Sequence, residues 1–475
     1  MNELIQMSWL FPEIIILVMA CIILLVGAAP KSESPFSYYG AQISLIVAGI
    51  LSYVCAPHQT LYEFNGNFIL DPFAVWMKLF VYMAVFLSFM YSRRYVDQQR
   101  IPRTEFYVLG LLSTLGMMVL ISSANLITLY LGLELLSLPL YAMVAMERTN
   151  PRSIEAAIKY FVLGSFASAL LLYGFSLFFG FTQTLDMHQI SVSLSSLHDQ
   201  PMVLILALVL ILAGLAFKWG AAPFQLWVPD VYEGAPSAVT LFISAAPKLA
   251  AFALAVRLLL DTMPSLLNHW QPILIVISLL SMAVGNVVAI VQKNIKRMLG
   301  YSSIAHMGYM CLGLAAGTIN GFSASMFYII SYTLMSLGAF GVIVLMSKEG
   351  YELESIEDFS GLNTRNPWLA FTLLLIMFSM AGIPPLFGFI AKVGLLESLI
   401  QVHMTWLAVT AILFAIIGAY YYLRIVKVMY FEEPLSKTPF VYTRSEQIAI
   451  SINAIAVLLL GVFPGALFVL CHLVI

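Results

Sequence analysis

Long apolar runs recur along the whole chain and are separated by short polar segments. A helix needs about 20 apolar residues to cross roughly 30 Å of hydrocarbon. By that criterion the pattern predicts an all-α polytopic membrane protein with about 14 transmembrane helices. The predicted spans are residues 8–29, 36–55, 70–91, 105–122, 124–146, 154–180, 202–228, 236–258, 271–291, 298–316, 320–347, 366–400, 404–424 and 446–472.

Two of these predicted spans contain helix-breaking residues. The seventh has glycines and a proline within 214–223, and the twelfth has glycines and paired prolines within 382–388. A proline removes a backbone donor and clashes with the preceding turn, so we expect helices 7 and 12 to be broken. The two spans lie five apart and therefore run in opposite directions. This pattern is typical of two inverted five-helix repeats with ion sites at the breaks.

The predicted spans divide the chain into four parts. Residues 1–104 form an N-terminal three-helix segment, whose first apolar run lacks the basic start of a signal peptide and is interpreted as retained. Residues 105–258 form the first repeat (helices 4–8) and residues 259–424 the second, inverted repeat (helices 9–13). Residues 425–475 carry helix 14.

Basic residues gather in alternate loops. If the N-terminus lies outside, the inner loops hold 16 basic residues, the outer loops hold only Arg257, at the end of a span, and five lysines fall inside spans. This bias predicts that both termini face outward, because basic loops stay on the inner side. The inner residues are Lys31, Arg93, Arg94, Arg100, Arg103, Arg148, Arg152, Lys293, Lys296, Arg297, Lys348, Arg365, Arg424, Lys427, Lys437 and Arg444.

The composition supports the membrane interpretation. Hydrophobic residues make up 61% of the chain and charged residues 10%, against about 25% in soluble domains. The net charge of −2 gives no positive electrostatic potential that would attract nucleic acid. The four cysteines are scattered singly, so we expect no metal or redox site, and no phosphate-binding loop or nucleophile–base pair is found.

Several ionisable residues fall inside predicted spans. Each costs roughly 2.5–3.5 kcal/mol on insertion scales, which favours a function over chance. Lys218 and Lys248 lie too deep to reach either interface, and a buried lysine can accept and release a proton. Glu134 is the expected charge partner of Lys218. Lys392, just after the second break, is a candidate for the same role. Lys78 could equally reach the membrane interface or pack against neighbouring helices.

The remaining candidates have two interpretations each. His306, inside the tenth span, is either a proton relay or a histidine with satisfied hydrogen bonds. Glu155 and Lys159 are spaced i, i+4 and are either functional or an ordinary helix pair. Asp230 and Glu233 are expected in the loop between spans seven and eight, where they form either a solvated turn or a gate.

Four segments resemble the antiporter-like membrane subunits of respiratory complex I. They are 131–140 (LGLELLSLPL), 217–236 (FKWGAAPFQLWVPDVYEGAP), 294–309 (NIKRMLGYSSIAHMGY) and 381–392 (AGIPPLFGFIAK). The resemblance covers essentially the whole chain. The segment VPDVYEGAP is fairly specific for the N-type members over their paralogues.

The resemblance implies a proton-translocating subunit of an NADH:quinone oxidoreductase, with two half-channels joined along the membrane midplane. It implies that Glu134 is the charged partner on helix five, Lys218 the helix-seven lysine and Lys248 the connecting lysine. His306 would belong to the second half-channel, and Lys392 would be its terminal residue. NADH, FMN, iron–sulfur clusters and quinone are expected on partner subunits, with no cofactor on this chain.

The resemblance also implies a location and neighbours. The chain would lie in a bacterial inner membrane with both termini periplasmic, beside M- and K-like subunits and the lateral helix of an L-like subunit. Lysine at position 392 fits N-type members, because M-type members typically have glutamate there. Two positions depart from the family pattern: Gln225 replaces a histidine common in relatives, and Val393 replaces an aromatic residue.

Three other hypotheses remain at this point. A subunit of a multisubunit sodium/proton (Mrp-type) antiporter would share the fold and the lysine series, and only the N-type wording of the motifs speaks against it. A stand-alone transporter of an organic solute would need a polar pocket at the breaks, where the flanking residues are apolar. A purely structural scaffold is disfavoured by the insertion cost of its buried charges.

Overall fold

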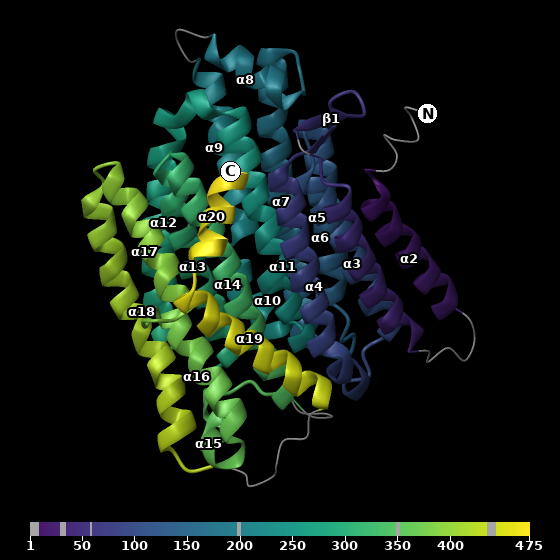
Figure 1. The fold of residues 1–475 in the computed structure, drawn as a ribbon, viewed down its shortest axis with the longest axis vertical. Coiled ribbons are helices and arrows are strands. Elements are labelled where there is room, and N and C mark those ends of the chain that lie inside the picture. Colours follow the sequence, from purple (N-terminus) through teal and green to yellow (C-terminus); the bar gives the residue numbers. More distant parts are fainter. Residues whose placement is uncertain (1–8, 29–34, 58, 197–200, 348–351, 435–442) are drawn as a thin grey trace.

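In the computed structural model the chain forms a single bundle of helices with one short β-ribbon (Figure 1). All residues are described except 1–8, 29–34, 58, 197–200, 348–351 and 435–442. The elements are α2 (Phe11–Gly27), α3 (Phe36–Val54), β1 (Leu61–Glu63), β2 (Phe68–Leu70), α4 (Pro72–Gln98), α5 (Arg103–Ile121), α6 (Leu126–Val144), α7 (Pro151–Thr182), α8 (Met187–Ser195), α9 (Met202–Trp219), α10 (Trp227–Gly234), α11 (Ser237–Val256), η1 (Arg257–Thr262), η2 (Pro264–Leu266), α12 (Leu267–Ile290), α13 (Ile295–Ala315), α14 (Ile319–Met346), η3 (Ile356–Phe359), α15 (Leu362–Arg365), α16 (Pro367–Ala381), α17 (Phe387–Gln401), α18 (Thr405–Phe431), α19 (Arg444–Val462) and α20 (Gly465–Val474).

The helical membrane architecture predicted from the sequence is confirmed. Among the described residues, 11 helices are long and apolar enough to span a membrane, and three more apolar helices are shorter. The number of fourteen crossings therefore stays a prediction. The boundaries of the four predicted parts of the chain also stay a prediction.

Some predicted boundaries differ from the structure. The fourteenth span is not one helix, because Pro464 separates α19 from α20. Helix α4 continues to Gln98 and α18 to Phe431, past the predicted ends at 91 and 424, because polar residues prolong both helices beyond the apolar runs. Lys31, Lys348 and Lys437, assigned to inner loops, lie outside the described residues.

Both predicted breaks are confirmed. Residues 220–226 separate α9 from α10, and residues 382–386 separate α16 from α17. The first residue of each break is a glycine in the left-handed region, with φ of 70° at Gly220 and 88° at Gly382. Glycine ends a helix in this conformation at little cost because it has no Cβ. Each break exposes the carbonyl end of a helix inside the bundle.

Matched glycines bring helices of each predicted repeat close together. A Cβ on Gly116 or Gly132 would overlap the backbone of the partner helix in the α5–α6 pair. A Cβ on Gly285 or Gly308 would do the same in the α12–α13 pair. Small residues at membrane helix contacts allow such close backbone approach. Each predicted repeat therefore begins with a tightly joined helix pair.

Helices α11 and α14 form the centre of the bundle and contact each other. Their most apolar windows are entirely buried inside the protein. The C-terminal α19 runs obliquely across the outside, over α14, α16 and α17 (Figure 1). The ribbon strand β1 and helix α8 lie at one end of the bundle and α15 at the other (Figure 1). We call the end that carries α15 the inner end, following the predicted orientation.

Candidate functional site

The first break places two lysines at the end of α9. Lys218 lies in the last turn of α9, and its Nζ donates a hydrogen bond to Ser137 Oγ at 2.9 Å. The expected ion pair with Glu134 is not formed. Glu134 lies one turn earlier on α6, and its buried Oε1 has no hydrogen-bond partner. Ser137 thus makes the direct contact, while Glu134 is near enough to act on Lys218 through its charge, and its role as the charge partner stays a prediction.

Lys248 lies on the central helix α11, and 2% of its surface is exposed. Its ammonium donates to the carbonyl oxygen of Trp219, the last residue of α9, and lies 5.7 Å from the ring centroid of Trp227. The carbonyl end of a helix carries a partial negative charge of about half an electron, which stabilises a cation. A cavity of about 20 Å³ touches both Lys218 and Lys248, and this volume suffices for one water molecule.

The second break repeats this arrangement. Lys392 on α17 donates to the carbonyl oxygens of Met380 at 3.1 Å and Ala381 at 2.9 Å, which are the last residues of α16. Its ammonium lies 5.2 Å from the ring centroid of Tyr309. A cavity of about 270 Å³, lined mostly by apolar side chains of α13, α17 and α18, lies beside it. Each internal helix end therefore holds one lysine ammonium.

His306 lies on α13 and is buried. Its Nδ1 is 2.7 Å from the hydroxyl of Tyr328, and its Nε2 is 3.0 Å from the hydroxyl of Tyr422. Tyr422 also forms a short hydrogen bond with Ser302. The imidazole is thus both satisfied and part of a chain of exchangeable protons, so its relay role stays a prediction.

Asp230 and Glu233 lie in helix α10, so the prediction of a loop is wrong. Apolar side chains on one face of α10 pack into the core, which stabilises a helix where the sequence suggested a turn. Asp230 contacts Lys159 at 2.7 Å and Arg297 at 2.8 Å, and Arg297 contacts Glu233 at 2.8 Å. Lys159 also pairs with Glu155 at 2.8 Å, as the i, i+4 spacing predicts.

This charge cluster is partly exposed. It lines an open pocket of about 180 Å³ formed by α7, α10 and α13. Because solvent screens exposed ion pairs, the cluster contributes little stability. It ties the second half of the broken seventh helix to two neighbours, and its role as a gate stays a prediction.

Sequence reasoning missed three ion pairs, each with a buried basic side chain. Glu13 contacts Lys78 at 2.5 Å, and 2% of the Lys78 side chain is exposed. The other two pairs are Asp71 with Arg257 at 2.8 Å and Lys296 with Glu352 at 2.8 Å. No local signal identifies these pairs, because their members are 65, 186 and 56 residues apart.

The described residues contain no group of three or more histidines, cysteines or acids placed to hold a metal ion. The four cysteines are free thiols. Gln225, the departure from the family pattern, has a buried Oε1 without a hydrogen-bond partner.

Comparisons with known proteins bear on the family and the fold of this chain. The family model described as NADH:quinone oxidoreductase/Mrp antiporter, TM, matches residues 123–418. A curated relative from Coxiella burnetii, named NADH-quinone oxidoreductase subunit N, is 59% identical over 97% of both chains. A chain of respiratory complex I from Thermus thermophilus is 31% identical, has a TM-score of 0.83, and matches over 97% of this chain and 100% of its own length.

The same fold occurs in an Mrp complex. A chain of the Mrp complex from Dietzia has a TM-score of 0.86 over 99% of this chain and 96% of its own length, at 18% identity. At that identity the match shows a shared fold alone.

Proposed function

Since this chain belongs to the family of NADH-quinone oxidoreductase N subunits, we propose that Lys218, Lys248 and Lys392 carry protons across it, assisted by Glu134 and His306. The chain is a proton-translocating membrane subunit of respiratory complex I, a translocase. The Mrp alternative has less support, because the Dietzia match shares only the fold. The proposal concerns which residues transfer the protons.

One observation carries this proposal: Lys248 and Lys392 each bind the carbonyl end of an interrupted helix inside the bundle. A helix end attracts a cation but does not neutralise it fully. The proton on each ammonium can therefore leave when the surrounding charges change. A fixed aspartate or glutamate at the same distance would bind the lysine more permanently.

Glu134 can supply the changing charge. Its carboxylate lies one turn from Ser137, the partner of Lys218, and is not bound to the lysine. A closer approach of Glu134 would favour the charged lysine, and withdrawal would favour transfer through the small cavity to Lys248. Moving one charge against 100 mV costs about 2.3 kcal/mol, so a modest movement of charges suffices.

The assembly follows from the same proposal. Other complex I subunits are the partners of this chain; M- and K-like neighbours and the lateral helix of an L-like subunit are the ones we propose. NADH, FMN, iron–sulfur clusters and quinone would bind those other subunits. The chain would lie in a bacterial inner membrane with both termini periplasmic. Asp230, Glu233, Glu155 and Lys159 would then form a charge cluster at its cytoplasmic side.

Replacement of Lys248 by methionine in the chromosomal copy tests the proposal. Proton pumping and NADH-to-quinone electron transfer are measured in membrane vesicles, and assembly is checked on native gels. We expect both activities to fall at least about tenfold in an assembled complex. The exposed Lys293→Met variant is the matched control and should pump normally.

The same experiment with Lys218→Ala tests the first half of the path. Normal pumping and turnover in both lysine variants would refute the proton path. Pumping that requires sodium ions would instead favour the Mrp-type alternative.

A further inference from the structure

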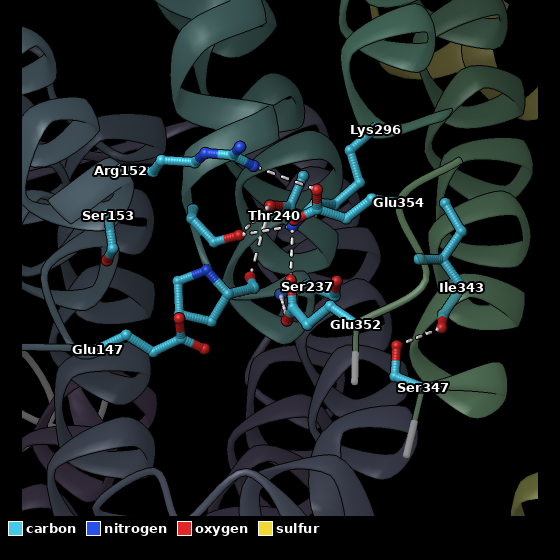
Figure 2. A network of polar contacts seen from close by, with 12 residues as sticks. Glu147, Arg152, Ser153, Ser237, Thr240, Lys296, Ile343, Ser347, Glu352 and Glu354 are labelled. Atoms are coloured by element: carbon cyan, nitrogen blue, oxygen red, sulfur yellow. Dashed lines mark hydrogen bonds and ion pairs between the residues drawn. The ribbon is translucent and has the colours of Figure 1, made fainter. Parts of the chain in front are cut away.

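The inner end of α11 carries a second group of buried polar residues, away from the two breaks (Figure 2). The backbone N–H of Ser237, the first residue of α11, donates to Glu352 Oε1 at 3.1 Å and to the hydroxyl of Tyr95 at 3.0 Å. Lys296 donates to Glu352 Oε2 at 2.8 Å and to the carbonyl oxygen of Ala235 at 3.1 Å. The carboxylate of Glu352 thus joins the start of α11 to α13.

Glu352 can reach solvent but Lys296 cannot. The exposed fractions of their side chains are 18% and 1%. Two residues further on, Glu354 and Arg152 form a solvent-exposed pair at 3.4 Å. Glu352 therefore occupies the boundary between the inner surface and the buried interior, which is where a proton acceptor at the mouth of a path would lie.

Hydroxyl groups continue from this boundary along one face of α11. Ser237, Thr240 and Ser244 precede Lys248 at intervals of three or four residues, so all four project from the same side of the helix. All are at most 2% exposed. Ser336 from α14 adds a hydroxyl by donating to Ser244 Oγ at 2.8 Å. Neighbouring positions on a helix face lie about 5–6 Å apart, so each step of a proton along the row would need one bridging water.

One member of this row has spare hydrogen-bonding capacity. The Oγ of Ser237 is buried and has no hydrogen-bond partner, although a buried polar group without a partner costs about 1–3 kcal/mol. A water molecule at this position would supply the missing hydrogen bond of the Ser237 hydroxyl. This open position lies next to Glu352, between the carboxylate and Thr240.

We propose that Glu352 takes up protons from the inner side and passes them to Lys248 along Ser237, Thr240 and Ser244, with Lys296 holding the carboxylate at the start of α11. The proton binds the carboxylate as a carboxylic acid, moves along hydroxyls and bridging water, and ends on a neutral Lys248. This inference rests on the proposed function, in which Lys248 is a proton carrier.

The electrostatics of Glu352 suit such exchange. Burial raises the pKa of its carboxyl, whereas the hydrogen bond from Ser237 and the Lys296 ammonium at 2.8 Å act in the opposite direction. The other charged or titratable groups that face it are Lys296 from α13, Tyr95 from α4 and Glu354 from its own loop. Burial and the lysine thus act in opposite directions, so the proton affinity of the carboxyl depends on the charge of its partner Lys296.

Three variants test the inference in the intact complex. Glu352→Gln keeps an acceptor for Ser237 but removes the titrating group, and Thr240→Val removes a hydroxyl while keeping the side-chain shape. We expect Glu352→Gln and Thr240→Val each to lower proton pumping and coupled turnover about tenfold or more in assembled complex. Glu352→Asp, which keeps a carboxylate, should retain part of the pumping. Glu357→Gln, an exposed acid five residues away, is the matched control and should retain normal pumping.

A double variant separates proton uptake from a structural role. If Glu352 only neutralises Lys296, then Glu352→Gln combined with Lys296→Met removes both charges and restores assembly and pumping together. We expect this double variant to assemble but not to pump, and restored pumping would overturn the inference.

The Lys248→Met variant separates this inference from the proposed function. If Lys248→Met abolishes pumping while Glu352→Gln and Thr240→Val pump normally, the proposed function stands and this inference is wrong. If Lys248→Met pumps normally, both are wrong.

Discussion

Lys218 on α9 donates its hydrogen bond to Ser137 and not to the carboxylate of Glu134, although Ser137 and Glu134 lie one turn apart on α6. A serine hydroxyl accepts from an ammonium without carrying a compensating charge. The lysine is therefore held in position while its protonation state remains open to change. Glu134, with a buried and unpartnered oxygen, is free to modulate it.

Replacement of Ser137 by alanine should therefore slow proton transfer without breaking an ion pair. The variant removes a hydrogen bond to a charged donor, which contributes about 1.5–3 kcal/mol. We expect coupled NADH oxidation in vesicles to fall about tenfold, since 1.4 kcal/mol corresponds to that factor. Ser137→Thr, which keeps the hydroxyl, should retain most of the activity. A wild-type rate in Ser137→Ala would show that this contact does not matter.

Substitution of Gly382 by alanine should disturb the second break. Its φ of 88° disfavours an L-residue by about 1–2 kcal/mol, and an added Cβ would lie 3.0 Å from the Nζ of Lys392. The flexible lysine must then shift away from the carbonyl end of α16, so we expect pumping to decrease together with thermal stability.

The matched control for this substitution is Gly180→Ala. Gly180 lies within α7, and a Cβ there would meet no atom within 4 Å. Alanine is a better helix former by about 0.5–1 kcal/mol, so this variant should be neutral or slightly stabilised, with normal pumping. Both variants are compared by proton pumping and by thermal denaturation of the purified complex. A decrease in both glycine variants would contradict the argument from local geometry.

Asp71 should stabilise the outer end of the bundle through Arg257. The two carboxylate oxygens of Asp71 accept from Arg257 at 2.8 and 2.9 Å, and Asp71 also caps α4 through the N–H of Ala74. Asn caps helices as well as Asp does, so Asp71→Asn removes mainly the ion pair. We expect a loss of about 3 kcal/mol, measured as a lower midpoint of thermal unfolding.

The effect of Asp71→Asn should depend on pH in a defined direction. Burial alone would raise the pKa of Asp71, but the charge and hydrogen bonds of Arg257 outweigh burial and lower it below 3.8. An acid with a lowered pKa in the folded state stabilises the fold above its unfolded value and loses this effect as the pH falls through the folded value. The difference between wild type and variant should thus be constant from about pH 5 to 8 and shrink below about pH 4. A difference that grows in acid would contradict this assignment.

The Glu13–Lys78 pair should behave as a buried structural pair between α2 and α4. Either Glu13→Gln or Lys78→Met alone leaves one charge buried without its partner, which costs about 3–5 kcal/mol. We expect low amounts of assembled complex in both single variants. The double variant should recover, because two neutral side chains need no partner. Failure of the double variant to recover would indicate a function for one of the charges.

The local features of the chain could be predicted from its sequence, and the long-range contacts could not. The glycines and prolines that follow α9 and α16 lie close together in the sequence, so they predict both breaks without knowledge of the packing. Pro464 was missed as a third interruption because the apolar pattern continues on both sides of it. The sequence predicts a loop for Asp230 and Glu233, because the buried face of α10 is too short to show a clear period.

In the candidate site, too, the residues themselves could be predicted but their contacts could not. Insertion cost alone identified Lys218, Lys248 and Lys392, but it does not predict which groups bind them. Ser137 was missed as a partner because a serine in an apolar span gives no signal of its own. Glu352 was missed because it lies in a polar loop, and only the folded chain brings it to the start of α11.

The complete enclosure of α11 and α14 has a consequence for the surroundings of the complex. Their apolar windows are entirely buried inside the protein, so other helices separate Lys248 and the hydroxyl row before it from the lipid. Acyl chain length and headgroup type act on the outer ring of helices, where leucine and isoleucine side chains are exposed. The dielectric environment of the central lysine is therefore fixed by the fold and stays the same when membrane composition changes with temperature or growth conditions.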